Sequence, residues 1–416
     1  MFGGVYRIGE KFSYTSTVQK KYDYVIIGAG IVGLSIGNSL LEKNPRAQVL
    51  IADKEKTLGA HASGRNSGVL HAGFYYSPDS LKAKFCRDGN QALRQVIDSH
   101  SIEIRNTGKV VVTRSLDELP RLQKLYERGI QNKVDIKLLS ASELPNYEPL
   151  AITHGQFLWS PTTAVSNPQD VINALALDFK FKGGQLELGS ELILEPNEDV
   201  YLNSEKIVCS EVINAAGVNA IHIAHKFGVG KEYSLLPVLG LYKTIPDESL
   251  PLKTLVYPVP NPANPFLGVH FTLTTDHKIK IGPTAIPVLG REQYKFSQGF
   301  DGDDLKHSIT AIAALGKKSF PGLVSLALTE FPKISTKNLL KGGSELVPLV
   351  SETTGWAIKE PGLRAQLVNK TTGEFEQDFI VRRKGKITHV LNAVSPGWTA
   401  SIPFSDWVVT EYLIGN

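Results

Sequence analysis

The chain has 416 residues, with 45 lysines and arginines against 41 acidic residues, a net charge of +4 and a hydrophobic content of 42%. This is the composition of a folded globular protein, and its small, dispersed basic excess excludes a protein that binds nucleic acid through a charged face. The two cysteines, Cys86 and Cys209, lie far apart, with no C-x-x-C pair and no histidines at zinc spacing, which excludes a disulfide scaffold or structural metal site and favours a reducing compartment.

The N-terminal segment, Met1 to Lys20, contains no apolar run long enough for the hydrophobic region of a signal peptide. No later stretch has eighteen or more apolar residues without a charge. We therefore expect a cytoplasmic protein without a membrane-spanning helix. The sequence leaves open a peripheral contact with the inner membrane.

A glycine-rich turn follows the first predicted strand. The apolar run Tyr24 to Ile27 predicts a buried strand of a parallel sheet, and Gly28, Gly30 and Gly33 follow it in G-x-G-x-x-G spacing. The first glycine permits a tight turn, the second lets the backbone approach a pyrophosphate, and the third allows close helix–strand packing. We expect the phosphates at the N-terminus of a helix that begins near Ile31, where free N–H groups attract anions.

The next elements complete a βαβ unit. The helix ends near Asn44-Pro45, because proline cannot continue it, and a second strand runs from Gln48 to Ala52. Asp53 lies 20 residues after the third glycine, at the position of the carboxylate that binds the adenosine ribose hydroxyls. An acid at this position favours FAD or NAD over NADP, so the unit predicts a dinucleotide site.

The segment from residue 59 to 86 reads GAHASGRNSGVLHAGFYYSPDSLKAKFC. Its small and polar residues predict a loop that wraps a ligand. From His61 to Tyr76 it resembles the FAD-dependent oxidoreductases of the D-amino-acid oxidase superfamily. Within that superfamily it is most similar to the L-2-hydroxyglutarate dehydrogenase group, whose loop has a similar H-x-[ST]-G-x-N-S-G-V-[IL]-H-x-G-x-Y-Y pattern. The resemblance implies FAD as the cofactor.

Further segments resemble the same group in the same order, so that the resemblance covers about residues 22–413. They are 120–132, 214–220, 257–272, 281–285, 360–366 and 389–402. The small residues of 214–217 and 395–401 let the backbone pass close to a cofactor, and an apolar stretch, Trp407 to Leu413, predicts a terminal helix. Together the patterns predict these cofactor-binding residues: Gly28, Gly30, Ile31, Gly33, Asp53, Lys54, Ser63, Gly64, Arg65, Asn66, Ser67, Gly68, Ala216, Gly217, Gly362, Pro396, Gly397, Trp398 and Thr399.

Two interleaved domains are expected within an α/β fold. A Rossmann-like FAD-binding domain with a parallel sheet takes residues 21–90, 151–235 and 341–416. An α+β substrate domain built on an antiparallel sheet takes residues 91–150 and 236–340 and roofs the flavin. Its candidate elements are a strand at Lys109–Thr113, a helix at Leu116–Gln131, and strands at Gly240–Thr244, Thr254–Tyr257, Leu267–Thr272 and Lys278–Ile281, with prolines between them.

Oxidation of a 2-hydroxy acid requires an anchor for the carboxylate and a base for the hydroxyl proton, while the flavin accepts the hydride at N5. Arg364 is the predicted anchor, because a guanidinium binds a carboxylate through two hydrogen bonds; the alternative is an ion pair with Glu360. His270 on a predicted strand is a candidate base or a core histidine. His71 is a candidate base, flavin contact or loop staple.

Four tyrosines are weaker candidates for the site. Tyr76, Tyr242 and Tyr257 are predicted to bind substrate, and Tyr75 is a further possibility; for each the alternative is simple packing. Leu239 stands where the L-2-hydroxyglutarate group usually has an arginine, and if that arginine holds a second carboxylate, a diacid is disfavoured here. Trp398 puts an indole where relatives usually carry small residues.

The leading functional hypothesis is FAD-dependent oxidation of a small 2-hydroxy acid to the 2-oxo acid, with L-2-hydroxyglutarate as the first substrate to test. The alternatives are an amine or amino-acid oxidase of the same superfamily and a flavin-binding protein without turnover. Oxygen or a quinone-linked carrier is the expected electron acceptor.

Overall fold

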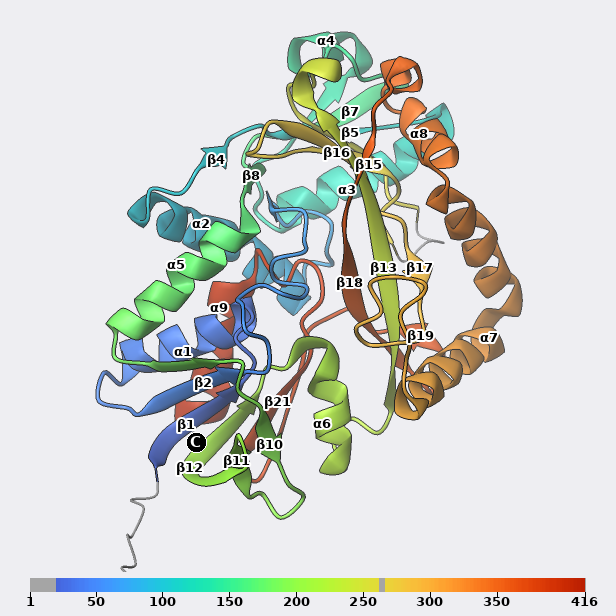
Figure 1. Cartoon of the computed structure of the whole chain (residues 1–416). Helices are drawn as coiled ribbons and strands as arrows, with labels where there is room; N and C mark the ends of the chain where they lie inside the picture. Colours follow the sequence, from blue (N-terminus) through green and yellow to red (C-terminus); the bar gives the residue numbers. More distant parts are fainter. Residues whose placement is uncertain (1–19, 262–265, 416) are drawn as a thin grey trace, which may run out of the picture.

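Two large sheets organise the computed structural model, which describes residues 20–261 and 266–415 (Figure 1). The N-terminal segment tested for a signal sequence lies almost wholly outside the described residues. An eight-stranded sheet and a ten-stranded sheet are each assembled from distant parts of the chain, and a small three-stranded sheet, β3 (Val69–Leu70), β8 (Ala164–Ser166) and β4 (Ile104–Arg105), adjoins them. The predicted mixture of parallel and antiparallel sheets in an α/β fold is confirmed.

The eight-stranded sheet contains the predicted βαβ unit. Its parallel strands lie in the order β21-β12-β1-β2-β9. Three antiparallel strands extend it: β11 pairs with β12, β10 pairs with β11, and β20 pairs with β21. The strands are β1 (Lys21–Ile27), β2 (Val49–Asp53), β9 (Gln185–Leu188), β10 (Leu192–Leu194), β11 (Val200–Leu202), β12 (Glu205–Asn214), β20 (Ile380–Lys384) and β21 (Ile387–Asn392). Helix α1 (Ile31–Lys43) begins and ends where the sequence predicted.

Helices α5 (Pro168–Phe181) and α9 (Ser401–Val408) pack against α1, and α2 (Leu81–Ser99) packs against α9 and α5. Two predictions are corrected here. Residues 81–86, expected within the loop, begin α2, where the Ser80 hydroxyl accepts a hydrogen bond from the Ala83 N–H at 3.1 Å. The terminal helix starts at Ser401, before the predicted Trp407, because Pro403 lies in its first turn, where no N–H is needed; it continues as a π-helical turn, Val409–Ile414.

The ten-stranded sheet is antiparallel except for the β5–β14 pair, and it follows the order β19-β18-β13-β16-β15-β14-β5-β7-β6, with β17 beside β13. Its strands are β5 (Lys109–Val112), β6 (Lys137–Ser140), β7 (Gln156–Ser160), β13 (Tyr233–Pro246), β14 (Leu255–Pro258), β15 (His270–Leu273), β16 (Lys278–Gly282), β17 (Ile286–Pro287), β18 (Ala357–Asn369) and β19 (Glu374–Phe375). The short helices α3 (Leu119–Gln131), α4 (Leu144–Tyr147) and α6 (Ala220–Lys226) connect its strands or flank it.

Sheet membership differs from the predicted domain boundaries at two places. Strands β7, β18 and β19 fall in ranges that we assigned to the FAD-binding domain, yet all three pair within the ten-stranded sheet. Strand β18 pairs with β13 along most of its length, from Tyr233–Asn369 to Thr244–Ala357. Local sequence pattern does not reveal which sheet a strand joins, so the two-domain division stays a proposal.

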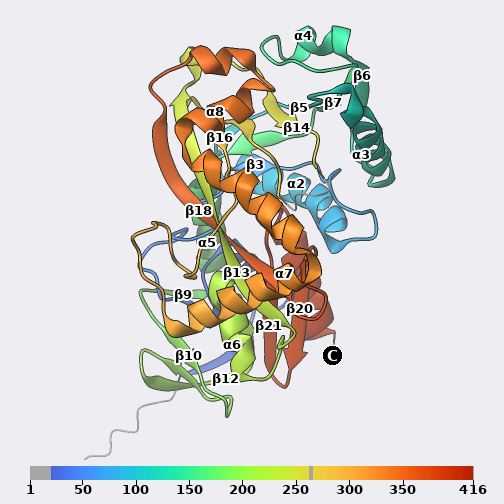
Figure 2. The same cartoon turned by 90° about the vertical axis from the view of Figure 1, so that its right-hand side faces the viewer.

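A long helix, α7 (Gly302–Glu330), crosses the outer face of β13 and β18, and α8 (Thr336–Ser344) follows it (Figure 2). Sequence reasoning missed both helices. Helix α7 is kinked at Ser319, whose backbone is non-helical, and Pro321 follows within it, which divides the apolar periodicity into two short runs. By length and composition alone Gly302–Ile334 passes as a candidate membrane span, but the kink and the Lys317-Lys318 pair interrupt it.

Candidate active site

A cavity of about 590 Å³ lies between the two large sheets. Its walls come from β1, β2, β10 and β21 on one side and from β13, β14, β15 and β18 on the other. Most of the predicted cofactor-binding residues line it: Gly28, Gly30, Ile31, Asp53, Lys54, Ser63, Arg65, Asn66, Ser67, Ala216, Gly217, Gly362, Pro396, Gly397, Trp398 and Thr399. Gly33, Gly64 and Gly68 do not, because their Cα atoms pack against neighbouring backbone.

The glycine-rich turn is shaped by close backbone contacts. Gly28 has φ +105°, and a Cβ there would lie 2.7 Å from the carbonyl oxygen of Ala215, the residue directly after β12. A Cβ on Gly33 would lie 2.0 Å from the carbonyl oxygen of Gly28. Both positions therefore require glycine, and Gly33 has the helix-packing role that the motif predicts.

Asp53 and Ser63 hold the turn from opposite sides. One Asp53 carboxylate oxygen accepts a hydrogen bond from the Ala29 N–H at 2.8 Å, and the Ser63 hydroxyl accepts one from the Ile31 N–H at 3.0 Å. Each carboxylate oxygen keeps a further lone pair for a ribose hydroxyl. The indole N–H of Trp398, on the cavity wall, is buried and has no hydrogen-bond partner among the described residues. The turn, the N-terminus of α1, the acid and this donor fit a dinucleotide.

The loop over the turn is fixed by its own contacts and by Tyr294. Arg65 donates from Nε to the Ala60 carbonyl at 2.6 Å, and its guanidinium lies 4.3 Å from the centre of the Tyr294 ring. His61 lies 2.7 Å from the Tyr294 hydroxyl through Nδ1 and 3.0 Å from Glu55 through Nε2. The loop is thus preformed around the cavity.

Arg364 lines the cavity from β18, where its strand partner is Val238 of β13. No described carboxylate forms an ion pair with it; Glu360, the alternative partner, lies 3.9 Å from Arg65 instead. Burial lowers the pKa of Arg364 from its ordinary value, and nearby Tyr242 and Tyr76 oppose that shift. An arginine remains protonated even so, so the cavity contains a cation without a carboxylate partner.

His270 reaches the same cavity from β15. Its Nδ1 lies 2.8 Å from the carbonyl oxygen of Gly268, and because a carbonyl only accepts, Nδ1 carries the proton and Nε2 has a free lone pair. The ring stacks on Tyr257 with 3.9 Å between centroids. Burial, with smaller contributions from Lys109, Lys280 and Arg364, lowers the pKa of His270 to about 3, so the imidazole is neutral at pH 7.

His71 lies on the cavity wall near these groups. Its Nδ1 is buried and has no hydrogen-bond partner in the described part of the chain. Burial, with smaller electrostatic effects of Lys109, His270 and Arg364, holds the pKa of His71 well below its ordinary value. A neutral ring with an unpartnered nitrogen is suited to a hydrogen bond with a bound ligand.

The predicted tyrosines divide into two groups. Tyr242 and Tyr257 line the cavity, whereas Tyr75 and Tyr76 stand behind its wall. Burial raises the pKa of Tyr242 to about 12, so its hydroxyl is neutral. Burial raises the pKa of the Tyr76 phenol, and the nearby Arg364 cation opposes part of that rise.

Sequence reasoning missed two buried lysines behind this wall. Lys109 is fully buried, its Nζ lies 4.6–4.8 Å from the ring centres of Phe74, Tyr75 and Tyr257, and it has no hydrogen-bond partner among the described residues. Lys280 lies 5.3 Å from the Tyr242 ring. Burial lowers the pKa of Lys109 to about 7 and that of Lys280 to about 8. The sequence contains one sign of the first of these lysines, since Lys109 stands at the start of the apolar strand 109–112.

The side chain of Leu239 points away from the cavity. It is buried against Val288 and Leu363, whereas its neighbours Val238 and Gly240 line the cavity. The alternation of side chains along β13 explains this arrangement. A leucine in place of arginine at this position therefore removes no charge from the cavity wall. Leu239 gives no reason to disfavour a substrate with two carboxylates.

Comparison with known proteins agrees with this geometry. The family described as FAD dependent oxidoreductase matches residues 23–409. L-2-hydroxyglutarate dehydrogenase from Salmonella houtenae is 32% identical over 398 residues, covering 94% of this chain and 93% of the relative. The mitochondrial L-2-hydroxyglutarate dehydrogenase of Homo sapiens is 31% identical over 428 residues, covering 95% and 89%.

Two solved structures share the fold. L-alpha-glycerophosphate oxidase from Mycoplasma pneumoniae with FAD bound has a TM-score of 0.73 at 21% identity, with 94% of each chain covered. Glycine oxidase from Geobacillus kaustophilus has a TM-score of 0.70 at 17% identity, again with 94% of each chain covered. At these identities the likeness extends to the fold alone.

Proposed function

The chain belongs to the family of FAD-dependent oxidoreductases, and we propose that it oxidises the hydroxyl-bearing carbon of a small 2-hydroxy acid, with L-2-hydroxyglutarate as its leading substrate. The observation that carries this proposal is Arg364, a cation on the cavity wall for which the described residues offer no carboxylate partner, beside His71 and His270. The names of the curated relatives support the choice of substrate.

FAD, when bound, accepts the hydride from C2 of the substrate. The glycine-rich turn, Asp53 and Ser63 would hold the dinucleotide, and the unpartnered indole N–H of Trp398 would donate a hydrogen bond to it. Negative charge on the phosphates is stabilised at the N-terminus of α1.

Arg364 would bind the substrate carboxylate through two parallel hydrogen bonds, which fixes the orientation of C2. His270 would accept the hydroxyl proton at Nε2, since its Nδ1–H is held by the Gly268 carbonyl. His71 would hydrogen-bond the substrate through its unpartnered nitrogen. As C2–H leaves as hydride and O–H as a proton, the C–O bond becomes a carbonyl.

The surroundings of the cavity also suit a dianionic acid. Besides Arg364, the buried Lys109 and Lys280 stand behind Tyr257 and Tyr242. Charges in a poorly solvated environment interact strongly, and a bound dianion would raise the pKa of both lysines and so increase their positive charge. This supports a dicarboxylate over a substrate with a cationic amino group.

Steady-state turnover with a dye acceptor tests the proposal. We expect L-2-hydroxyglutarate to have a higher kcat/KM than its D-enantiomer, than shorter monocarboxylic 2-hydroxy acids, and than N-methyl or primary amino acids. Turnover of amino acids alone would identify an amino-acid oxidase instead. Absence of turnover with every compound would identify a flavin-binding protein without activity.

The pH dependence of kcat/KM reports on the proposed base. Because burial lowers the pKa of His270 to about 3, the basic form persists as pH falls and is lost only below its pKa in the folded protein. We expect no fall in kcat/KM as the pH decreases from 7 to about 5, whereas an ordinary histidine base, with a pKa near 6.5, would lose activity over that range. A histidine-like inflection that disappears in His270→Gln would contradict the neutral buried base.

We also propose that electrons pass to oxygen or to a quinone-linked carrier, and that the protein is cytoplasmic and contacts the inner membrane peripherally. The second half of α7 supports such a contact: Phe320, Val324 and Leu328 are exposed at four-residue intervals, which places them on one face of the helix. In the sequence, the exposed Lys317 precedes this face and the exposed Lys337, on α8, follows it, and basic residues near an apolar face favour binding to anionic membrane surfaces.

Flotation with vesicles that contain anionic lipid tests this contact. We expect the wild-type protein to float, and the double variant Val324→Ser and Leu328→Ser to float much less, because less apolar area enters the lipid. The control is Leu177→Ser with Phe181→Ser, a similar exposed pair on α5. Equal flotation of both variants, or none of the wild type, would exclude the α7 face.

A further inference from the structure

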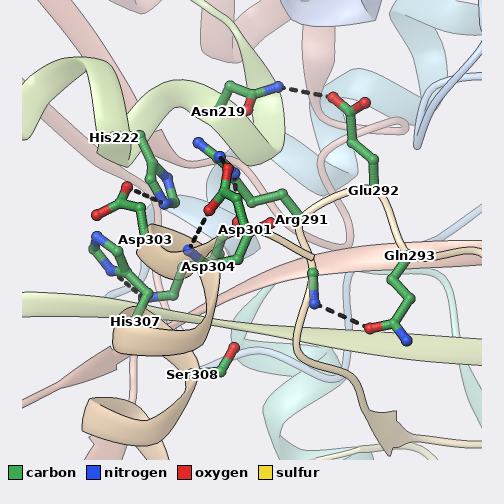
Figure 3. Close-up of polar contacts among 12 residues, drawn as sticks. Asn219, His222, Arg291, Glu292, Gln293, Asp301, Asp303, Asp304, His307 and Ser308 are labelled. Carbon is green, nitrogen blue, oxygen red and sulfur yellow. Dashed lines mark hydrogen bonds and ion pairs between the residues drawn. The ribbon is translucent and has the colours of Figure 1, made fainter. Parts of the chain in front are cut away.

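Three side chains of types that can bind a metal lie close together where α6 approaches α7, outside the residues assigned to catalysis (Figure 3). His222 belongs to α6, and Asp303 and His307 belong to the first two turns of α7. His222 Nε2 and Asp303 Oδ2 are 3.3 Å apart, and one ligand atom from each of the three side chains lies within 4.8 Å of the others. The two imidazole rings have centroids 4.3 Å apart.

Both histidines present a nitrogen for which the described residues offer no hydrogen-bond partner. His222 is 8% exposed, and neither of its ring nitrogens forms a hydrogen bond within the described chain. His307 Nδ1 lies 3.2 Å from the Ser234 hydroxyl, which donates its own proton to the His307 carbonyl at 2.9 Å. Nδ1 also accepts a hydrogen bond from the Leu235 N–H at 3.4 Å, so the hydrogen-bonding contacts of the His307 ring with the described residues lie at Nδ1 and leave Nε2 available to a metal. A metal at Nε2 would place the ring proton on Nδ1, where the Ser234 oxygen can accept it.

The charges around the group permit a cation. Arg291 is the nearest cation, and it is paired with Asp301 at 2.6 Å and with Asp304, as Figure 3 shows. His225 is not a ligand, since its Nε2 lies 2.9 Å from the Gly230 carbonyl.

We propose that His222, Asp303 and His307 bind one Zn²⁺ ion that links α6 to α7. Zinc prefers four ligands at tetrahedral angles, with bonds of about 2.0–2.2 Å to imidazole nitrogen and carboxylate oxygen, so neighbouring ligand atoms stand about 3.4 Å apart. The 3.3 Å between His222 and Asp303 fits this edge. Asp303 is 56% exposed, so water fills the fourth position.

The two histidines are distant in the sequence, which is why a search for zinc spacing excluded a metal.

The ion would join two parts of the cavity wall. Helix α6 follows Ala216 and Gly217, which line the cavity, as does His222 itself. Helix α7 packs against β18, which contributes Arg364. Zinc would hold the α7 side of the ten-stranded sheet against the eight-stranded sheet.

Metal titration of the chelator-treated, flavin-loaded protein tests the proposal. We expect one Co²⁺ per chain, detected by the visible bands of a tetrahedral ion, displacement by Zn²⁺, and a rise in Tm with Zn²⁺. Asp303→Asn should weaken binding at least about 10- to 100-fold, since even indirect partners of a metal contribute that much. Because Asp303 is exposed, this variant keeps the fold.

The matched control is Asp170→Asn, an exposed acid in the first turn of α5, which should bind Co²⁺ like the wild type. His222→Gln provides a second test and should also lose the tetrahedral bands. No saturable binding, or equal binding by Asp303→Asn and the wild type, would overturn the site. Both outcomes are measured by metal content and spectra, so they are independent of turnover.

Discussion

Replacing Arg364 with methionine lowers kcat/KM for L-2-hydroxyglutarate roughly 30- to 5,000-fold, because the loss of one partner from a buried, hydrogen-bonded charge pair costs about 2–5 kcal/mol. Methionine keeps much of the side-chain volume and removes the charge. Arg364 lacks a carboxylate partner among the described residues, so its removal leaves no described acid unpaired. Flavin content should therefore change little, and steady-state kinetics should report the loss.

Two controls separate anchoring from structural effects. Arg364→Lys keeps the charge but loses the planar pair of donors, so its kcat/KM should fall between those of the wild type and Arg364→Met. Arg46→Met removes an exposed arginine far from the cavity wall and should be neutral. If Arg364→Met retained wild-type kcat/KM with full flavin, Arg364 would not be the carboxylate anchor.

Replacing Gly28 with alanine yields protein that is purified without FAD. The new Cβ would stand 2.7 Å from the Ala215 carbonyl oxygen, at a φ of +105° that alanine adopts only under strain. Relief of the contact moves β1 from β12 or changes the turn, and either shift removes the surface that receives the pyrophosphate. The ratio of flavin to protein absorbance measures the loss.

Gly183→Ala is the matched control for Gly28→Ala. Gly183 also has a positive φ, +93°, but no atom lies within 4 Å of the position of its Cβ. The strain alone should lower stability by about 1 kcal/mol or somewhat more, with full FAD content. Equal flavin loss in both variants would assign the effect to backbone strain in general.

The βαβ unit could be predicted from sequence because its determinants are local. Strand β1, the glycine turn, α1, β2 and Asp53 follow one another within residues 21–53, and each has its own residue preference. Helix α7 was missed because Pro321 and the kink at Ser319 divide its pattern. Strand β18 pairs with β13 of the ten-stranded sheet, a long-range contact that the local sequence pattern does not show.

The candidate site could also be predicted only in part from the sequence. Arg364, His270 and His71 were found through the resemblance, and the fold brings them to one cavity. Lys109 and Lys280 were missed because only the tertiary structure shows what surrounds a buried lysine. The His222, Asp303 and His307 group was missed for the same reason, since its members lie on two helices far apart in sequence.

The absorbance spectrum of the FAD-loaded protein, recorded without oxygen on addition of substrate, tests the central claim most directly. The proposed function predicts that L-2-hydroxyglutarate bleaches the flavin bands rapidly and completely, that the D-enantiomer does not, and that bleaching by the Arg364→Met variant is much slower. Bleaching by amino acids and not by any 2-hydroxy acid would contradict it.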